Sequence, residues 1–230
     1  MDARSAQEVP DGDPDALYRD RESLASATQA ARIWSARLEN DARDFESAWK
    51  LARIRYWLGT NGLPEQERKA SLELGVAAGR TAAALEPRRP EGHFWMAANM
   101  GALAESFGLR QGLRYRRPIK EALETVLALD PAFQAGSADR ALGRWYFEVP
   151  GLFGGSDRTS ETHLRKALSY NERSIITRLF LAETLWALGR KEEARAELRT
   201  ALDAPLDPDW APEDRRFKAQ AEGLLTQYSR

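Results

Sequence analysis

The stretch RLFLAETLWALGRKEEARAELRTAL, residues 178–202, carries apolar side chains at the spacing of two helices joined by a tight turn. Small side chains stand where antiparallel helices cross closely, and leucines stand where they interlock. These positions are Leu181, Ala182 and Leu185 before the turn, Gly189 within it, and Ala194, Leu198 and Ala201 after it. Glycine fits the turn because it adopts a left-handed backbone without a side-chain clash. One such helix pair cannot bury its apolar faces alone, so the stretch predicts further pairs stacked on it.

Ala-Leu pairs recur along the chain and mark further copies of this unit. They stand at Ala84-Leu85, Ala128-Leu129, Ala167-Leu168 and Ala201-Leu202, with spacings of 44, 39 and 34 residues. The last spacing is the period of a tetratricopeptide repeat, about 34 residues. The sequence therefore predicts an all-α fold, a tetratricopeptide-like helical-repeat solenoid (α-α superhelix) of about four helix pairs plus terminal helices.

The helix pairs can be placed on the sequence from their apolar faces and from the prolines and glycines that punctuate them. First helices are expected over residues 45–58, 91–107, 132–147 and 174–188. Second helices are expected over 65–85, 118–129, 160–168 and 191–202. A helix over 20–39 opens the array and one over 212–229 closes it. We expect a single domain over 16–230, preceded by a disordered tail over 1–15.

Composition narrows the class of function. The formal net charge is −1, from 34 basic and 35 acidic residues, whereas a general nucleic-acid binder is strongly basic. The chain has no cysteine, which excludes disulfides, thiolate catalysis and cysteine-rich zinc sites. No apolar run is long enough to cross a bilayer, and the first residues do not form a secretory signal. We therefore expect a cytoplasmic protein, or a periplasmic one if a leader has been removed.

Catalytic and metal-binding patterns are not found. The two histidines, His93 and His163, belong to no spaced metal motif, and each is interpreted as an ordinary helix residue. Carboxylates occur mainly in helix-surface sets such as Glu192, Glu193 and Glu197, which are typical of solvated faces. We expect no enzyme activity, no cofactor and no metal.

Two segments are unusual and each has two interpretations. Residues 148–160, EVPGLFGGSDRTS, lack the flanking strand and Lys-Ser/Thr of a phosphate loop, so we expect a long turn on which Leu152 and Phe153 fold back. The alternative is a loop that contributes Phe153 to a ligand pocket. Residues 109–120, LRQGLRYRRPIK, hold five cations around Tyr115: Arg110, Arg114, Arg116, Arg117 and Lys120. This segment is either an anion-binding patch or a solvated turn that ends where Pro118 opens a helix.

Aromatic residues concentrate on the expected first helices, which line the concave surface in this repeat class. Most large rings at helical spacing fill a core. Trp95 and Asn99 nevertheless share a helix face, and Arg144 and Trp145 stand on the next first helix. The candidate binding residues are Trp95, Asn99, Arg144, Trp145, Phe153, Arg114, Arg116 and Arg117.

Two known families resemble parts of residues 90–228. The block ADRALGRWYFEVPGLFGGSDRTSETHLRKAL is similar to the tetratricopeptide T-component of TRAP transporters. The matching elements are Leu142-Gly143, Trp145-Tyr146, Pro150, Gly154-Gly155 and His163-Leu164. The segments HFWMAANMG, IKEALETVLALDP and PEDRRFKAQAEGLLTQYS resemble the eukaryotic regulators of microtubule dynamics. The first resemblance implies a periplasmic helical protein that partners a solute-binding subunit and channels a small organic ligand. The second implies a scaffold for other proteins.

These observations favour a non-enzymatic scaffold that binds a protein partner through its concave face, as an accessory component of a solute transport system if the first resemblance holds. The alternative is a carrier that holds a small organic or hydrophobic ligand in an aromatic-lined channel beside Trp95 and Trp145. No nucleic-acid partner and no transmembrane segment are expected.

Overall fold

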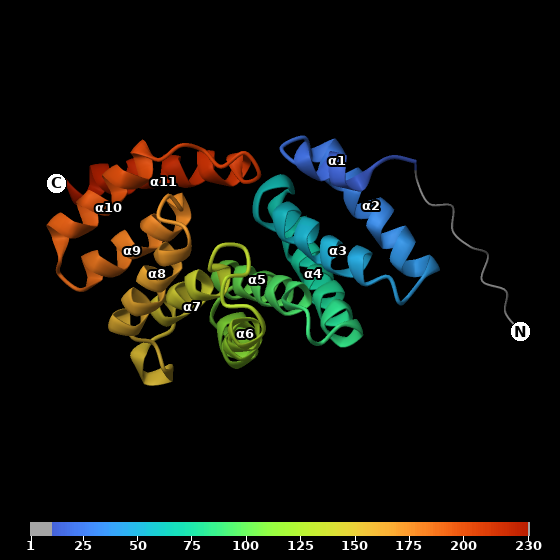
Figure 1. Cartoon of the computed structure of the whole chain (residues 1–230), viewed down its shortest axis with the longest axis horizontal. Helices are drawn as coiled ribbons and strands as arrows, with labels where there is room; N and C mark the ends of the chain where they lie inside the picture. Colours follow the sequence, from blue (N-terminus) through green and yellow to red (C-terminus); the bar gives the residue numbers. More distant parts are fainter. Residues whose placement is uncertain (1–10, 230) are drawn as a thin grey trace, which may run out of the picture. The chain divides into compact units, whose positions relative to one another are not determined.

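The computed structural model describes residues 11–229, and all regular elements in this range are helices (Figure 1). The all-α, tetratricopeptide-like helical-repeat class predicted from the sequence is confirmed. The chain divides into two compact units, residues 1–129 and 130–230, which are described separately. No helix of the described range is long and apolar enough to cross a membrane.

Residues 11–129, the described part of the first unit, contain six α-helices, which pack mainly against their neighbours in the chain. They are α1 (Pro14–Arg19), α2 (Leu24–Asn40), α3 (Phe45–Trp57), α4 (Glu65–Leu85), α5 (Pro90–Ser106) and α6 (Leu109–Leu129), with a π-helical turn at Leu58–Gly62. The first helices of consecutive pairs, α3 and α5, also contact each other. Trp34, Ile54, Leu72, Leu103 and Leu123 are among the fully buried core residues of this unit.

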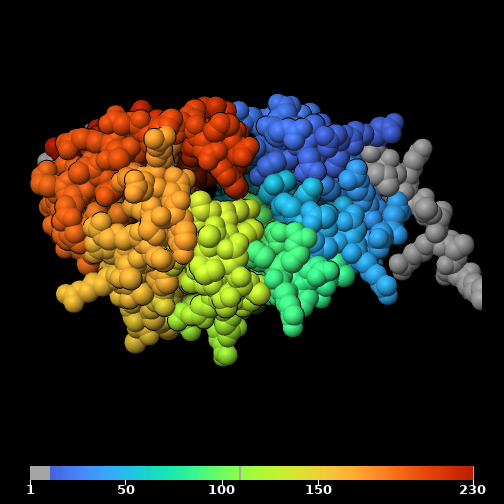
Figure 2. Space-filling view, in the orientation of Figure 1, coloured from blue at the N-terminus to red at the C-terminus, as the bar shows by residue number. Residues whose placement is uncertain are grey.

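The second unit, described over residues 130–229, shows the same pattern with five α-helices. They are α7 (Ser137–Glu148), α8 (Asp157–Tyr170), α9 (Ile175–Ala187), α10 (Lys191–Asp203) and α11 (Ala211–Tyr228), with a 3-10 turn, η2, at Gly151–Phe153. The first-helix partners α7 and α11 both contact α9. Side chains of neighbouring helices fill the spaces that separate the ribbons within each unit (Figure 2).

The repeat that predicted the fold is well formed in the second unit. Leu181, Ala182, Leu185, Ala194, Leu198 and Ala201 are all fully buried in one core cluster. Gly189, in the turn between α9 and α10, has a φ of +79°, a left-handed conformation that suits glycine. The small residues therefore lie where the helices pack, as the spacing predicted.

Side-chain caps fix where several helices begin. Asp44 Oδ1 accepts a hydrogen bond from the backbone N–H of Ser47 at 2.9 Å, at the start of α3. Ser156 Oγ accepts one from the N–H of Thr159 at 3.2 Å, at the start of α8. Such caps satisfy backbone donors that have no partner inside the first turn of a helix.

Three predicted helix starts are wrong. The opening helix expected over 20–39 begins at Leu24 as α2, after the separate helix α1 that ends at Arg19. The second helix of the second pair was expected to begin at Pro118, but α6 begins at Leu109 and runs through the proline. The apolar stripe Tyr115, Ile119, Ala122, Leu123 and Val126 is buried on both sides of Pro118, and the proline is exposed. Burial of this stripe outweighs the one helical hydrogen bond that proline cannot donate.

The helix expected over 132–147 instead begins at Ser137 as α7. The three preceding residues, Gln134, Ala135 and Gly136, have φ values of 44°, 53° and 75°. A right-handed helix cannot pass through residues with left-handed backbones, so it starts only after them.

The domain boundaries stay a prediction. Most of the expected tail over 1–15 lies outside the described residues, and α1 begins at Pro14, two residues before the predicted start of the domain. The proposal of one domain over 16–230 is likewise not decided by the division into two compact units.

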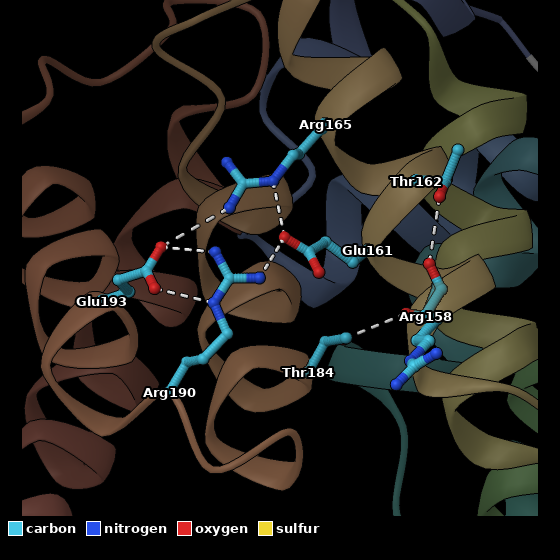
Figure 3. A network of polar contacts seen from close by, with 8 residues as sticks. Arg158, Glu161, Thr162, Arg165, Thr184, Arg190 and Glu193 are labelled. Carbon is cyan, nitrogen blue, oxygen red and sulfur yellow. Dashed lines mark hydrogen bonds and ion pairs between the residues drawn. The ribbon is translucent and has the colours of Figure 1, made fainter.

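Four charged side chains join the second helices of the second unit (Figure 3). Glu161 Oε1 on α8 accepts hydrogen bonds from Arg165 Nε at 2.8 Å and from Arg190 Nη1 at 2.6 Å. Arg190, just before α10, also donates two hydrogen bonds to Glu193, at 2.7 and 2.5 Å. Burial opposes ionisation of Glu161, but the hydrogen bonds from the two arginines outweigh it and lower its pKa. The hydrogen bond from Arg190 lowers the pKa of Glu193.

We expect this network to make stability depend on acid pH. Because the pKa of Glu161 is lower in the folded state, its contribution is complete above the unfolded glutamate pKa, about 4.3, and is lost as pH falls through the folded pKa. Glu161→Gln should therefore lower the melting temperature by about 1–4 °C near neutral pH, and the difference from wild type should shrink in acid. Thermal melts across this pH range test it, with Glu222→Gln on the exposed face of α11 as control. A difference that persists unchanged in acid would contradict it.

Candidate functional site

The basic stretch found in the sequence forms the first half of α6, so the interpretation as a solvated turn is wrong. Within it, Arg117 Nε donates to Glu121 Oε1 at 2.6 Å, and Lys120 Nζ lies 3.7 Å from Glu124 Oε1. Arg110 and Arg114 are exposed and form no ion pair within the part of the chain that the structure describes. Two arginines on α6 are therefore available for an outside anion.

The helix fixes the spacing of these two arginines. Residues four apart lie on the same face of an α-helix, with about 6 Å of rise between them. The opposite face is anchored, since Tyr115 and Ile119 are buried. Arg116 is half-buried and does not share the face of Arg110 and Arg114. Arg110 and Arg114 thus form a fixed pair of cations.

A hollow of about 700 Å³ lies beside this pair. It is lined by Lys69, Glu73, Phe107, Arg110, Gln111 and Arg114. Lys69 and Glu73 come from α4, and Lys69 Nζ lies 3.7 Å from Glu73 Oε1. Phe107 comes from the turn between α5 and α6 and supplies an aromatic wall. We call this hollow, defined by its six lining residues, the basic hollow.

One polar atom of the basic hollow lacks a hydrogen bond. Gln111 Oε1 is buried, and no described residue donates to it. A buried amide oxygen without a donor is energetically unfavourable, by about 1–3 kcal/mol. The hollow thus combines two arginines that have no carboxylate partner in the described chain with a glutamine whose buried oxygen lacks a donor.

The basic hollow lies between second helices, α4 and α6, whereas the sequence analysis placed the binding surface on first helices. A smaller hollow of about 340 Å³ also touches the first helix α5, through His93, Met96 and Met100. The ring of His93 is engaged, because its Nε2 lies 3.1 Å from the carbonyl oxygen of Pro87.

Trp95 and Asn99, proposed from the sequence as binding residues, lie in the core of the first unit. Trp95 is 3% exposed and Asn99 is fully buried. Asn99 Nδ2 donates to the carbonyl oxygens of Ala52 at 2.9 Å and Trp95 at 2.8 Å. The bond to Ala52 attaches α5 to α3, whereas the bond to Trp95 lies within α5, so Asn99 has a packing role between two core helices.

Arg144 and Trp145 belong to the second unit, on α7. Arg144 forms ion pairs with Glu148 at 2.7 Å and with Glu183 at 2.9 Å, and its guanidinium lies 4.7 Å from the ring centre of Phe180. Trp145 is buried. Arg144 is thus held between α7 and α9 by two carboxylates.

The loop after α7 is a long turn, as expected, but its apolar side chains do not both fold back. The N–H of Ser156 donates to the carbonyl oxygen of Tyr146 at 2.8 Å and closes the loop. Leu152 is 90% exposed, so the expectation that it packs on the helices is wrong. Phe153, the candidate pocket residue, is 42% exposed.

One contact of His163 could not be predicted from the sequence. Its Nδ1 lies 2.7 Å from Oδ1 of the buried Asp139, and its ring stacks on Tyr146 at 5.4 Å between centres. The ring thus donates a hydrogen bond from α8 to α7. The pair is 24 residues apart, a separation with no motif to reveal it. No group of three or more potential metal ligands occurs among the described residues.

Comparisons with solved structures agree with the fold. A thermophilic TPR protein of Thermus thermophilus aligns with a TM-score of 0.68 at 22% identity, over 93% of this chain and 97% of its own. PilF of Pseudomonas aeruginosa aligns with a TM-score of 0.56 at 16% identity, over 93% of this chain and 90% of its own. MamA aligns with a TM-score of 0.55 at 16% identity, over 92% of this chain and 99% of its own. At these identities the likeness shows the fold alone.

Two protein families match the sequence itself. The tetratricopeptide repeat matches residues 160–221, the region that contains the repeat found first. No curated protein matches the chain. The resemblance to the T-component of TRAP transporters stays a prediction.

The family Regulator of microtubule dynamics protein 1-3 matches residues 13–153, well over half of the chain. That match contains the segments HFWMAANMG and IKEALETVLALDP, extends from them toward the N-terminus and includes every residue of the basic hollow. The third segment, PEDRRFKAQAEGLLTQYS, lies outside it. The chain therefore belongs to the family of Regulator of microtubule dynamics protein 1-3.

Proposed function

We propose that this chain is a non-enzymatic scaffold that binds a protein partner, and that the basic hollow is the site of contact. The tetratricopeptide-like fold supports an interaction role, because stacked helix pairs present rigid surfaces that lose little entropy on binding. The observation that carries the assignment to this site is the pair of exposed arginines, Arg110 and Arg114, which have no carboxylate partner in the described chain.

Some arginines are already engaged, since Arg117, Arg144 and Arg190 each have a carboxylate within 3 Å. Other exposed arginines, such as Arg88, form no ion pair with the described residues either but do not line this hollow. Arg110 and Arg114 instead face a hollow that a partner can enter. Charge-assisted hydrogen bonds to carboxylates are about twice as strong as neutral ones, so filling this site with an acidic group is favourable.

The test is site-specific photo-crosslinking. A benzophenone amino acid replaces Leu113, which is 49% exposed on α6, and in the control it replaces Leu206, which is 38% exposed in the second unit. The family name refers to microtubule dynamics, so assembled microtubules are the first purified partner to test. Proteins that crosslink from a cell extract are identified by mass spectrometry and tested again as purified components.

We expect a purified partner to crosslink at position 113 and not at 206. The double substitution Arg110→Glu and Arg114→Glu should reduce crosslinking at 113 by about ten-fold or more, because two favourable charge contacts become repulsive. A partner that crosslinks equally at both positions, or that is unaffected by the charge reversal, would show that the basic hollow is not the contact site.

A second candidate function is a carrier of a small organic anion, within a transport system if the T-component resemblance holds. It is supported by the volume of the basic hollow, which lies in the range of small-molecule sites, about 300–1,000 Å³. The channel proposed beside Trp95 and Trp145 has less support, because both side chains are buried. Native mass spectrometry of the purified protein separates the two functions, since a co-purifying small molecule would refute a scaffold without a ligand.

A further inference from the structure

We infer that the occupant of the basic hollow is an extended peptide segment of the partner, with acidic residues at alternate positions bound by Arg110 and Arg114. This inference rests on the proposed function and specifies its ligand. It is carried by the spacing of the two arginines and by the charges and the aromatic ring around them.

The spacing of the arginines matches alternate residues of an extended chain. Arg110 and Arg114 are one helical step of four residues apart, a rise of about 6 Å along α6. In an extended peptide each residue advances about 3.3 Å, and side chains two apart point to the same side, about 6.6 Å from each other. Two acidic residues separated by one residue therefore meet the two guanidinium groups when the peptide lies along α6.

The other residues of the basic hollow favour a peptide over a phosphate or a nucleic acid. Gln111, between the two arginines in the sequence, lines the hollow with a neutral amide side chain, which adds no further positive charge for a polyanion. Glu73 on the opposite wall repels a polyanion but accepts further N–H groups. The ring of Phe107 offers a surface for an apolar side chain that flanks the acidic pair.

The number of acidic positions follows from the ion pairs on α6. Arg117, the next residue on the same face, already donates to Glu121 at 2.6 Å. A third acidic residue on the peptide would have to compete with this intramolecular pair. We therefore expect two alternating carboxylates to be sufficient and a third to improve affinity by less than about three-fold.

The experiment measures binding of fluorescein-labelled synthetic peptides by anisotropy. One peptide carries the order Glu-Ser-Glu-Phe, and an isomer of identical charge carries Glu-Glu-Ser-Phe. We expect the alternating peptide to bind at least about five-fold more tightly, because only its carboxylates reach both arginines in an extended conformation. Arg110→Gln and Arg114→Gln should each weaken its binding by about ten-fold. Arg88→Gln, an exposed arginine of the same unit outside the basic hollow, should leave it unchanged.

Two results would overturn the inference. Equal binding of the two peptide isomers would show that the hollow does not recognise an extended register. Displacement of the peptide by tripolyphosphate or oligothymidine at matched charge would show that the site binds anions in general. The comparison of isomers uses the wild-type protein, so it does not depend on the folding of a variant. If a partner crosslinks at position 113 and neither peptide binds, the proposed function stands and this inference fails.

Discussion

Gly75→Ala is expected to lower the free energy of unfolding of the first unit by about 2 kcal/mol or more. Gly75 lies on α4 at its crossing with α5, where a Cβ atom would stand 2.1 Å from Asn99 Oδ1. The amide cannot easily move away, because its Nδ2 is held by the carbonyl oxygens of Ala52 and Trp95. The methyl group must therefore push α4 and α5 apart or break these hydrogen bonds.

A double-mutant cycle tests whether this clash is the cause. Asn99→Ala alone should destabilise the unit through loss of its two hydrogen bonds, about 1 kcal/mol each. In the double variant with Gly75→Ala the clash is absent, so its destabilisation should be smaller than the sum of the two single effects. Chemical denaturation gives the change in the free energy of unfolding for each variant. Hydrogen exchange of peptides from α4 and α5 then shows whether the destabilisation is located in these two helices.

Gly101→Ala is the matched control for the same substitution. Gly101 lies inside α5, and a Cβ atom there would meet nothing within 4 Å. This substitution should stabilise the unit by about 0.5–1 kcal/mol, because alanine favours the helix. If Gly75→Ala and Gly101→Ala had the same effect, close packing at Gly75 would not limit stability.

The repeat register was predictable because it depends on local side-chain size. Leu181, Leu185, Ala194 and Ala201 carry the spacing of a helix pair, and all are fully buried. The expected helix over 191–202 is found at Lys191–Asp203, since its glycine turn and its small residues lie within one repeat. The register of this helix pair can therefore be predicted without knowing the rest of the fold.

The errors arise where tertiary packing overrides local preference. From the sequence, Pro118 is expected to start a helix, since proline usually opens a helix and disrupts its interior. In the structure the buried stripe that includes Tyr115 and Ile119 continues through it. Pro118 itself lies on the exposed side of α6, so its ring does not interrupt the packing of this stripe. Only the packing of α6 on α5 shows which tendency prevails.

The candidate site was predicted in part. Arg110 and Arg114 were found as members of a basic run, but Lys69 and Glu73 lie about forty residues earlier, and no spacing links them to that run. Trp95 shows the converse problem, because an aromatic residue on a first helix has the same pattern whether it lines a surface or fills a core. Whether such an aromatic residue lines a surface or fills a core is decided by packing in three dimensions, which the spacing of residues in the sequence does not show.

Ala194→Trp should have the largest effect on the second unit, a loss of about 3 kcal/mol or more. Ala194 is fully buried on α10, in the same core cluster as Leu181 and Leu185 of α9. An indole ring there must displace α10 from α9, and the contacts of α9 with α7 and α11 are then disturbed as well.

Ala196→Trp is the control, because Ala196 is exposed on the same helix two residues away. Denaturant titration should show a large loss for position 194 and a change within about 0.5 kcal/mol for position 196. Equal effects at the two positions would mean that the small residues of the repeat do not mark the helix crossing, and the physical basis of the fold assignment would be lost.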